Sequence, residues 1–120
     1  MQGWYSVRSV FRSDRTEDGQ PRRSFEERVV LFRAASFEDA LAKGEVEAKC
    51  YSAHAADSPH YHMLDHLVAY YIHSDEVLCD GDEVWSCFRD MDTSDELFLK
   101  KIFEDENESL TNVWRQKPEA

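Results

Sequence analysis

The sequence predicts an α+β fold with the element order β-β-α-β-β-α, in which a four-stranded antiparallel sheet carries two helices packed on one face. Two stretches of β-branched and aromatic residues are each followed, after a Gly-containing turn signal, by a second such stretch, which is the pattern of a hairpin. Each hairpin is then followed by a helix N-terminus signal and by apolar residues at helical spacing. We therefore expect a single domain over residues 1–108, with residues 109–120 as a C-terminal tail that either docks or frays.

The first hairpin is expected to pair Trp4–Phe11 with Phe25–Arg33. Both runs are rich in aromatic and β-branched residues, which favour strands. The polar stretch between them, Ser13–Arg23, contains Asp18-Gly19 and a proline, and it is predicted to be a long loop.

The first helix is expected to open at Ser36 and to end near Ala53. A serine hydroxyl can accept a hydrogen bond from the free amides of the first turn, and Glu38 and Asp39 suit the positive end of the helix dipole. Small side chains in the apolar stripe would let this helix lie close on a sheet; the stripe consists of Phe37, Ala40, Leu41, Gly44, Ala48 and Tyr51.

The second hairpin is expected to pair Leu64–His73 with Val84–Phe88 across a tight turn at Asp80-Gly81-Asp82. A capping box from Thr93 to Glu96 then opens the second helix. Because the first strand of this hairpin is apolar on both sides, we expect the sheet face without helices to be covered by the tail, by a second copy or by a partner.

The net charge of −11 is the most unusual bulk property of this chain. Residues 75–108 alone hold three basic and thirteen acidic residues, a net charge of −10. Such a surface repels nucleic acid and anionic lipid and attracts a basic protein, although solubility alone is an equal explanation. We expect a cytoplasmic protein, because no apolar run is long enough to cross a bilayer and no signal peptide is evident. The three cysteines are expected to be reduced and mostly buried: Cys50, Cys79 and Cys87.

Three segments in order resemble the bacterial family called domain of unknown function 4288: Trp4–Arg8, Phe25–Ala34 and the helix opening Ser36–Ala40. Glu47–Tyr51 matches the late tyrosine of the family's helix. The likeness covers roughly residues 3–90 and is clearest over residues 3–51. The family has no established activity, so the resemblance implies none and transfers no catalytic residue.

One candidate site is a group of histidines, His60, His62 and His66, which would share one face of an extended chain. Two imidazoles presented from a strand can bind one zinc ion, and the further ligands would come from Asp65, Asp57 or His54. The competing interpretation, which we favour, is that these imidazoles are simply exposed. No other cofactor is expected.

A second candidate is the triplet Glu26-Glu27-Arg28, where Glu26 and Arg28 point to one side of a strand and Glu27 to the other. Paired carboxylates near an arginine could serve acid–base chemistry. Cross-strand pairing with Arg8 or Arg12 explains the same residues without a substrate, and we favour it.

The sequence contains no nucleophile motif and no glycine-rich phosphate loop, which favours a non-enzymatic protein-binding domain. Its concrete form would be an acidic inhibitor or immunity-type protein that blocks a basic toxin or nuclease. The alternatives are a metal- or small-ligand-binding domain or enzyme that uses the histidine group, and an accessory domain that works as a homodimer. The expected partner-binding residues are Asp80, Asp82, Glu83, Trp85, Asp92, Asp95 and Tyr71.

Overall fold

A computed structural model describes residues 2–54, 60–74 and 77–103 of the chain. It is divided into two compact units, Met1–Cys87 and Phe88–Ala120, and each is described by itself. The α+β class is confirmed, and the elements in chain order are β1 (Gly3–Glu17), β2 (Gln20–Ala34), α1 (Phe37–His54), β3 (Tyr61–Ser74) and α2 (Asp95–Phe103).

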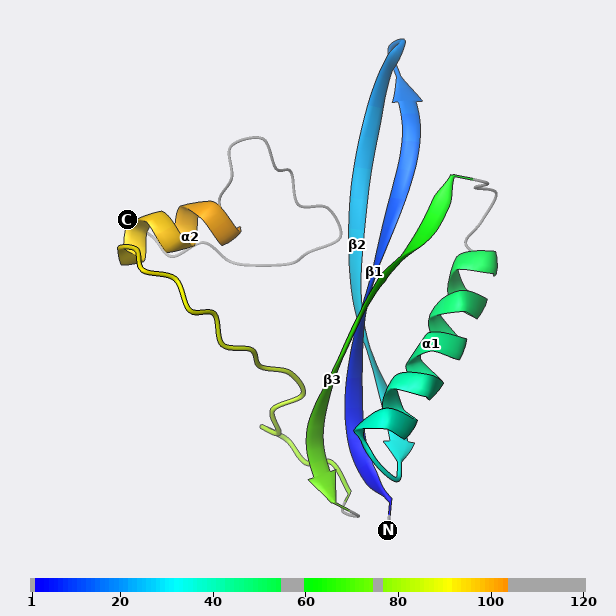
Figure 1. Cartoon of the computed structure of the whole chain (residues 1–120), viewed down its shortest axis with the longest axis vertical. Coiled ribbons are helices and arrows are strands. Elements are labelled where there is room, and N and C mark those ends of the chain that lie inside the picture. The colour runs from blue at the N-terminus through cyan, green and yellow to red at the C-terminus, as the bar shows by residue number, and fades with distance from the viewer. Residues whose placement is uncertain (1, 55–59, 75–76, 104–120) are drawn as a thin grey trace. The chain divides into compact units, whose positions relative to one another are not determined.

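β1 is the central strand of a three-stranded antiparallel sheet with the order β2-β1-β3, and α1 packs against one face of that sheet (Figure 1). β1 and β2 pair along their whole length, from Gly3↔Ala34 to Glu17↔Gln20, without a shift of register. The pairing of β1 with β3 stops at Ser13↔Tyr61 and contains two irregularities. The β1–β2 hairpin therefore extends past β3 as a two-stranded ribbon (Figure 1).

The prediction of a long loop over Ser13–Arg23 is wrong. Asp18 and Gly19 alone turn the chain, with φ of 53° and 77°, and the flanking residues pair as strand residues. Positive φ at both central residues matches the twist of a two-stranded ribbon, so an Asp-Gly pair suffices as a hairpin turn. The residues around it are polar because they lie on an exposed ribbon.

The first helix begins as predicted. Ser36 Oγ accepts a hydrogen bond from the Asp39 amide at 3.1 Å, and Asp39 Oδ2 accepts one from the Ala35 amide at 2.9 Å. The arrangement is similar to a capping box, except that the aspartate carboxylate bonds to the amide of the residue before the N-cap serine. It fixes the point at which the chain leaves β2 and crosses onto the sheet.

The small-residue stripe of α1 lies on the sheet, as the sequence predicted: Ala40, Gly44 and Ala48 are the buried residues of the helix. Tyr5 and Val7 of β1 are buried beneath it. The core cluster of this face consists of Tyr5, Val7, Ala34 and Ala40, with Phe32, Leu41, Leu67 and Ala69 packed against it.

The predicted fourth strand is not found among the described residues, where the element order is β-β-α-β-α. The turn at Asp80-Gly81-Asp82 does form: the Asp82 amide donates to the Cys79 carbonyl at 3.1 Å, and Gly81 has φ 92°. However, none of the described residues after this turn, up to residue 103, forms a backbone ladder with the sheet. Residues 77–87, here called the cover segment, contact the sheet face opposite α1 through side chains instead.

The second unit contains α2, whose cap lies one residue later than predicted. Ser94 Oγ, not the Thr93 hydroxyl, accepts a hydrogen bond from the Leu97 amide at 3.3 Å, and the Ser94 carbonyl accepts one from the Phe98 amide. The predicted packing of both helices on one sheet face stays a prediction. The tail over 109–120 lies outside the described residues.

Two bulk expectations can be compared with the described residues. All three cysteines are free, as expected, but they are exposed and not buried, because Cys50 lies on the outer side of α1 and the other two in the irregular chain after β3. Neither α1 nor α2 combines the length and the apolar character that a membrane crossing requires.

Candidate functional site

A carboxylate held by two tyrosines lies on the α1 side of the sheet. The Tyr51 hydroxyl of α1 donates to Glu26 Oε1 at 2.8 Å, and the Tyr61 hydroxyl of β3 donates to the same oxygen. Beneath them the buried ring of Phe11 stacks on Tyr61 with centroids 5.5 Å apart. We call Glu26, Tyr51 and Tyr61 the tyrosine clamp, because it joins β2, α1 and β3 at one point.

Arg28 extends the tyrosine clamp along α1. Its guanidinium donates two hydrogen bonds to the Glu47 carboxylate, at 2.7 and 3.2 Å, and its Cζ lies 3.5 Å from the centroid of the Tyr51 ring. A forked ion pair that also stacks on an aromatic ring is a geometry that lysine cannot reproduce. These contacts hold the C-terminal half of α1 on the sheet.

The tyrosine hydroxyls of this clamp are held in their protonated form. The hydrogen bond to Glu26 raises the pKa of Tyr51, and burial together with the hydrogen bond to Glu26 raises the pKa of Tyr61 further. A phenol with a raised pKa is a poor nucleophile and a poor general base at neutral pH. The arrangement therefore suits a structural clamp better than acid–base chemistry.

The sequence interpretation of Glu26-Glu27-Arg28 is confirmed in its geometry. Glu27 points to the opposite face, where it forms an ion pair with Arg8 of the neighbouring strand. The partners of Glu26 and Arg28 on α1 were not predicted. Glu47 and Tyr51 stand four residues apart in the sequence and so share one side of the helix, which was the available signal.

The three predicted metal ligands are all exposed: His60, His62 and His66. His62 Nε2 lies 3.7 Å from Asp14 Oδ2, and the Asp14 carboxylate also lies within ion-pair distance of Arg12 and Arg23. Within 2–54, 60–74 and 77–103, no group of three or more His, Cys, Asp or Glu side chains is gathered in a way that could hold a metal ion. Asp57, one of the further ligands considered, lies outside these ranges.

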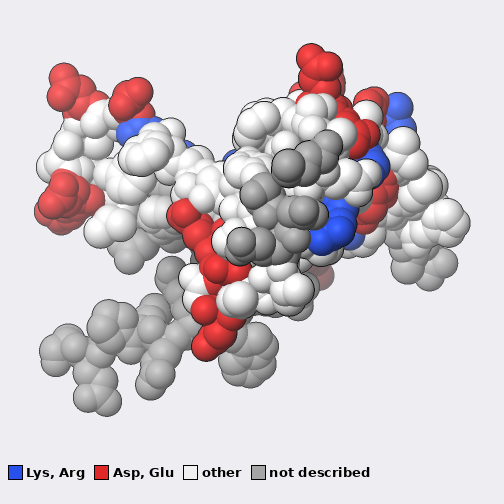
Figure 2. Space-filling view, turned by 90° about the horizontal axis from the view of Figure 1, so that it is seen from below, with Lys and Arg blue, Asp and Glu red and all other residues white. Residues whose placement is uncertain are grey.

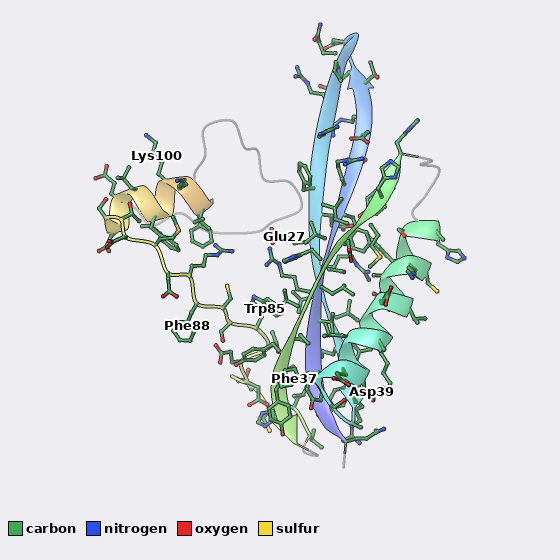
Figure 3. All side chains as sticks on the ribbon, in the orientation of Figure 1. Glu27, Phe37, Asp39, Trp85, Phe88 and Lys100 are labelled. Carbon is green, nitrogen blue, oxygen red and sulfur yellow. The ribbon has the colours of Figure 1, made fainter. Side chains whose placement is uncertain are left out.

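The cover segment lies on the sheet face opposite α1, here called the second face. The buried Ser6 hydroxyl donates to the Val84 carbonyl at 2.5 Å. The Trp85 ring packs against Tyr70 of β3, with centroids 6.2 Å apart, and lies 5.9 Å from the Arg8 guanidinium. Figure 3 shows Glu27 and Trp85 on one side of the sheet and Asp39 of α1 on the other. The cover segment thus contacts β1 and β3.

Acidic side chains of the cover segment are tied to β3. Asp82 Oδ2 accepts a hydrogen bond from the Cys79 amide at 2.5 Å and lies 3.1 Å from His73 Nε2. The backbone hydrogen bond, and then the contact with His73, lower the pKa of Asp82. Glu83 accepts a hydrogen bond from the Tyr70 hydroxyl at 2.6 Å. These contacts hold the carboxylates of Asp82 and Glu83 beside β3 on the second face.

The β2 side of the second face remains open. Phe25, Val29 and Leu31, here called the apolar row, are 61%, 45% and 42% exposed. They alternate along β2 with residues that face α1 and are half-buried, so they project from the same face as Glu27. Val29 and Leu31 are neighbours on this face, and Phe25 is separated from them by Glu27, so the row is an apolar surface interrupted by one charged side chain. No sequence pattern distinguished this row from core residues.

The predicted partner-binding residues are found on both faces of the sheet and in the second unit. Asp80, Asp82, Glu83 and Trp85 belong to the cover segment on the second face. Tyr71 lies on the α1 side of the sheet, in contact with Tyr5 and Phe37. The remaining two, Asp92 and Asp95, belong to the second unit, where Asp95 is in the first turn of α2.

A family model described as "Domain of unknown function (DUF4288)" matches residues 4–86. The chain belongs to this family. Neither a curated protein nor a solved structure matches the chain.

The range that matches the DUF4288 model contains both surfaces described above. It begins at Trp4 in β1 and ends at Ser86, so it includes the sheet, α1 and nearly all of the cover segment, and it excludes α2. The segments that carried the resemblance in the sequence meet in space, because Glu26 and Arg28 contact Tyr51 and Glu47. The DUF4288 unit is therefore the sheet with one face closed by α1 and the other partly covered.

Figure 2 shows acidic side chains in several separate groups, with less surface formed by Lys and Arg. The cover segment holds three acidic residues and no basic one. Beside the apolar row, Glu27 is the acidic residue, and it is paired with Arg8. The second face therefore combines an apolar strip on β2, the arginines Arg8 and Arg12 opposite that strip on β1, and acidic side chains of the cover segment over β3.

Proposed function

We propose that this chain is a non-enzymatic protein-binding domain, and that a basic protein docks on its second face. The observation that carries the proposal is the apolar row, in which Phe25, Val29 and Leu31 are all more than two-fifths exposed on one strand. Exposed apolar surface with a polar rim is typical of protein interaction sites. The row lies within the part of the chain that matches DUF4288.

Charge supports a basic partner. The chain carries a net charge of −11, and the cover segment, which contacts β1 and β3 on the second face, contains Asp80, Asp82 and Glu83 without a basic residue. Complementary charge accelerates encounter with a basic surface and disfavours acidic competitors and nucleic acid. The apolar row would supply affinity, and the acidic cover segment would supply selectivity.

The concrete form that we propose is an inhibitor of immunity type, which occupies the basic surface of a toxin or nuclease. Small size and strong negative charge support this form, because an acidic surface competes with nucleic acid for the same basic groups. Its mode of action would be steric occlusion, which needs no catalytic residue.

The test is capture of partners by the tagged full-length chain at low and at high salt, with quantitative mass spectrometry. We expect one basic protein in near-equal amount, released by salt, and lost from the Val29→Ser/Leu31→Ser double variant. Val46→Ser is the matched control, because Val46 is 64% exposed on α1 and is not on the second face. Equal capture by the double variant and by wild type would overturn the proposal.

A second set of variants tests the charge. Asp80→Asn combined with Asp92→Asn and Asp95→Asn should weaken capture and reduce its salt dependence. Asp82 is spared because it holds the turn through the Cys79 amide, so its replacement would change structure as well as charge. Unchanged salt dependence in the triple variant would show that the acidic surface serves solubility alone.

A further inference from the structure

β3 forms one border of the sheet, and its outer edge has no strand beside it among the described residues. The sheet order is β2-β1-β3, so β3 pairs with β1 alone, and Val84–Phe88, expected to be a fourth strand, forms no ladder with it. Outside the β1 ladder, no described residue forms a backbone hydrogen bond to residues 67–71. An edge strand presents free backbone N–H and C=O groups, which are a template for another strand.

The two edge strands of the sheet differ in their protection against pairing. β2 carries four arginines and Pro21, which discourage an added strand. β3 contains no Pro, Lys or Arg, and Asp65 is its one acidic residue. The two irregularities of the β1–β3 register lie on either side of residues 67–71, where the pairing with β1 is unbroken. These five residues of β3, here called the open edge, are the part of the sheet that can accept another strand.

The elements that cover the sheet lie on its faces and centre on β1. The Val84 carbonyl accepts a hydrogen bond from Ser6 of β1, so the cover segment crosses the second face as far as the central strand. On the other face, Gly44 of α1 packs on Val7 of the same strand. A strand added to the open edge would therefore lie between these two layers, with its side chains directed alternately to each of them.

The two sides of the open edge differ in their chemistry. On the second face, Glu83 of the cover segment accepts a hydrogen bond from the Tyr70 hydroxyl. On the α1 side, the rings of Phe37 and Tyr71 contact each other and the buried Tyr5, and they remain 51% and 41% exposed. An added strand would thus meet a carboxylate on one side and aromatic rings on the other.

We propose that an extended segment of the basic partner adds to the open edge of β3 as a fourth strand, and this inference rests on the proposed function. Backbone hydrogen bonds to β3 would supply binding, and alternate side chains would supply selectivity. Basic side chains of the segment would face the cover segment, and the apolar side chains between them would face Phe37 and Tyr71. The segment would extend the docking surface of the second face beyond β3.

The local charge selects a basic segment for this edge. Residues 61–87, which include β3 and the cover segment, contain six acidic residues and no Lys or Arg. Arg8, which is the partner of Val68 in the β1–β3 register, is already paired with Glu27. A basic segment neutralises this field, whereas a second copy would bring an equal set of acidic residues to the same edge. The proposal therefore commits to a partner segment, and self-association is one of the outcomes of the test.

The probe is a short synthetic peptide of alternating lysine and valine, with an alternating glutamate and valine peptide as the charge control. Two further versions of the lysine peptide carry N-methyl groups on alternate amides, one version on each set. A strand pairs through one edge only, so methyl groups on one set block its hydrogen bonds and those on the other set face away from β3. Binding is measured by fluorescence anisotropy on the full-length chain, and amide hydrogen exchange locates the site.

The strand-addition model expects the lysine peptide to bind and the glutamate peptide not to bind. One methylated version should lose at least about tenfold in affinity, and the other should keep it. The amides of the open edge that point away from β1 should exchange rapidly in the free chain and slowly in the complex. Amides of β2 should show no change.

Two variants test the contacts at the open edge. Val68→Lys places a positive charge on a residue that is 36% exposed there, and it should weaken binding of the lysine peptide, whereas Val46→Lys on the exposed side of α1 should not. Glu83→Gln retains an acceptor for the Tyr70 hydroxyl but removes the charge, so it should also weaken binding. Its matched control is Glu45→Gln on α1. Circular dichroism establishes that each variant is folded.

Several results would overturn the inference. Equal binding of both methylated peptides would show docking without strand pairing, and absence of binding while partner capture is intact would exclude the open edge; the proposed function would stand in both cases. Slow exchange of the outward amides in the free monomer would assign the edge to the chain itself. A dimer in analytical ultracentrifugation, with protection of β3, would assign it to a second copy.

Failure of the proposed function is measured separately, by partner capture with the Val29→Ser/Leu31→Ser variant. Capture equal to that of the wild type would remove the docking surface on which this inference depends, whatever the peptide does.

Discussion

Gly44 of α1 packs so closely on Val7 of β1 that a Cβ at position 44 would lie 2.6 Å from Val7 Cγ1 and 3.0 Å from Val7 Cβ. Real Cβ atoms do not approach other heavy atoms so closely, and β1 is the central strand of the sheet, which leaves little room for the neighbour to shift. The absence of a side chain at Gly44 therefore sets the distance between α1 and the sheet.

Gly44→Ala should destabilise the protein by about 1–2 kcal/mol, although alanine favours a helix over glycine by about 1 kcal/mol. The cost of forcing the added methyl group against Val7 exceeds the gain in helix propensity. Chemical denaturation followed by circular dichroism measures the change. Val46→Ala on the exposed side of the same helix is the control and should be neutral or stabilising.

The double variant Val7→Ala/Gly44→Ala separates the clash from other effects. Val7→Ala alone removes buried methyl groups and costs stability. It also removes the atoms that a methyl group introduced at position 44 would meet, so in this background Gly44→Ala should no longer destabilise. An unchanged cost of Gly44→Ala in the Val7→Ala background would contradict the close contact.

The small-residue stripe of α1 is the part of the fold that sequence reasoning captured best. Helical spacing of Ala40, Gly44 and Ala48 is a local pattern, and local patterns survive into the structure when one face must be buried. The strands β1, β2 and β3 were expected for the same reason. The hairpin turn was interpreted as a loop because polar residues surround it, although its Asp-Gly pair carried the correct signal.

Nothing in the sequence argued against the fourth strand. Val84–Phe88 has the composition of a strand, but Trp85 packs on Tyr70 and the Ser6 hydroxyl bonds to the backbone of Val84. These side-chain contacts depend on where three distant segments meet. The tyrosine clamp was missed for the same reason, since Glu26, Tyr51 and Tyr61 come from three elements.

Arg28→Lys should destabilise the protein by about 1–2 kcal/mol while keeping the charge. The lysine ammonium cannot donate the forked pair of hydrogen bonds to Glu47 or stack as a plane on the Tyr51 ring. The denaturation midpoint should fall with an unchanged m-value. Arg15→Lys is the control, since Arg15 is half exposed on the projecting ribbon and pairs with Glu17. Equal effects at the two positions would remove the special role of Arg28.

Asp82→Asn should destabilise the protein at neutral pH and have little effect in acid. The folded state lowers the pKa of Asp82 below its ordinary value of about 3.9, so the contribution to stability is present above that pH and is lost as the pH falls below it. Denaturation at a series of pH values should show the wild-type and variant curves converging below about pH 4. Asp80→Asn in the same turn is the control. Parallel curves would mean that the Asp82 carboxylate is not the group that titrates.

The tyrosine clamp should make the protein sensitive to alkali. Tyr51 and Tyr61 both have a raised pKa in the folded state, whereas an unfolded tyrosine loses its proton near pH 10. Above about pH 10 the unfolded state therefore binds fewer protons than the folded state, and the free energy of unfolding falls as the pH rises. Below that pH the two states bind the same number, and the stabilisation is fully present.

Tyrosinate absorbance during an alkaline titration measures this effect directly. We expect Tyr51 and Tyr61 to ionise only as the protein unfolds. In Glu26→Gln the negative charge is gone, so both hydroxyls should ionise at lower pH, and the fall of stability above about pH 10 should become shallower. The variant should also be less stable at neutral pH, because a charged acceptor has been replaced by a neutral one. Ionisation of Tyr51 and Tyr61 near pH 10 in the folded wild-type protein would show that the clamp does not form.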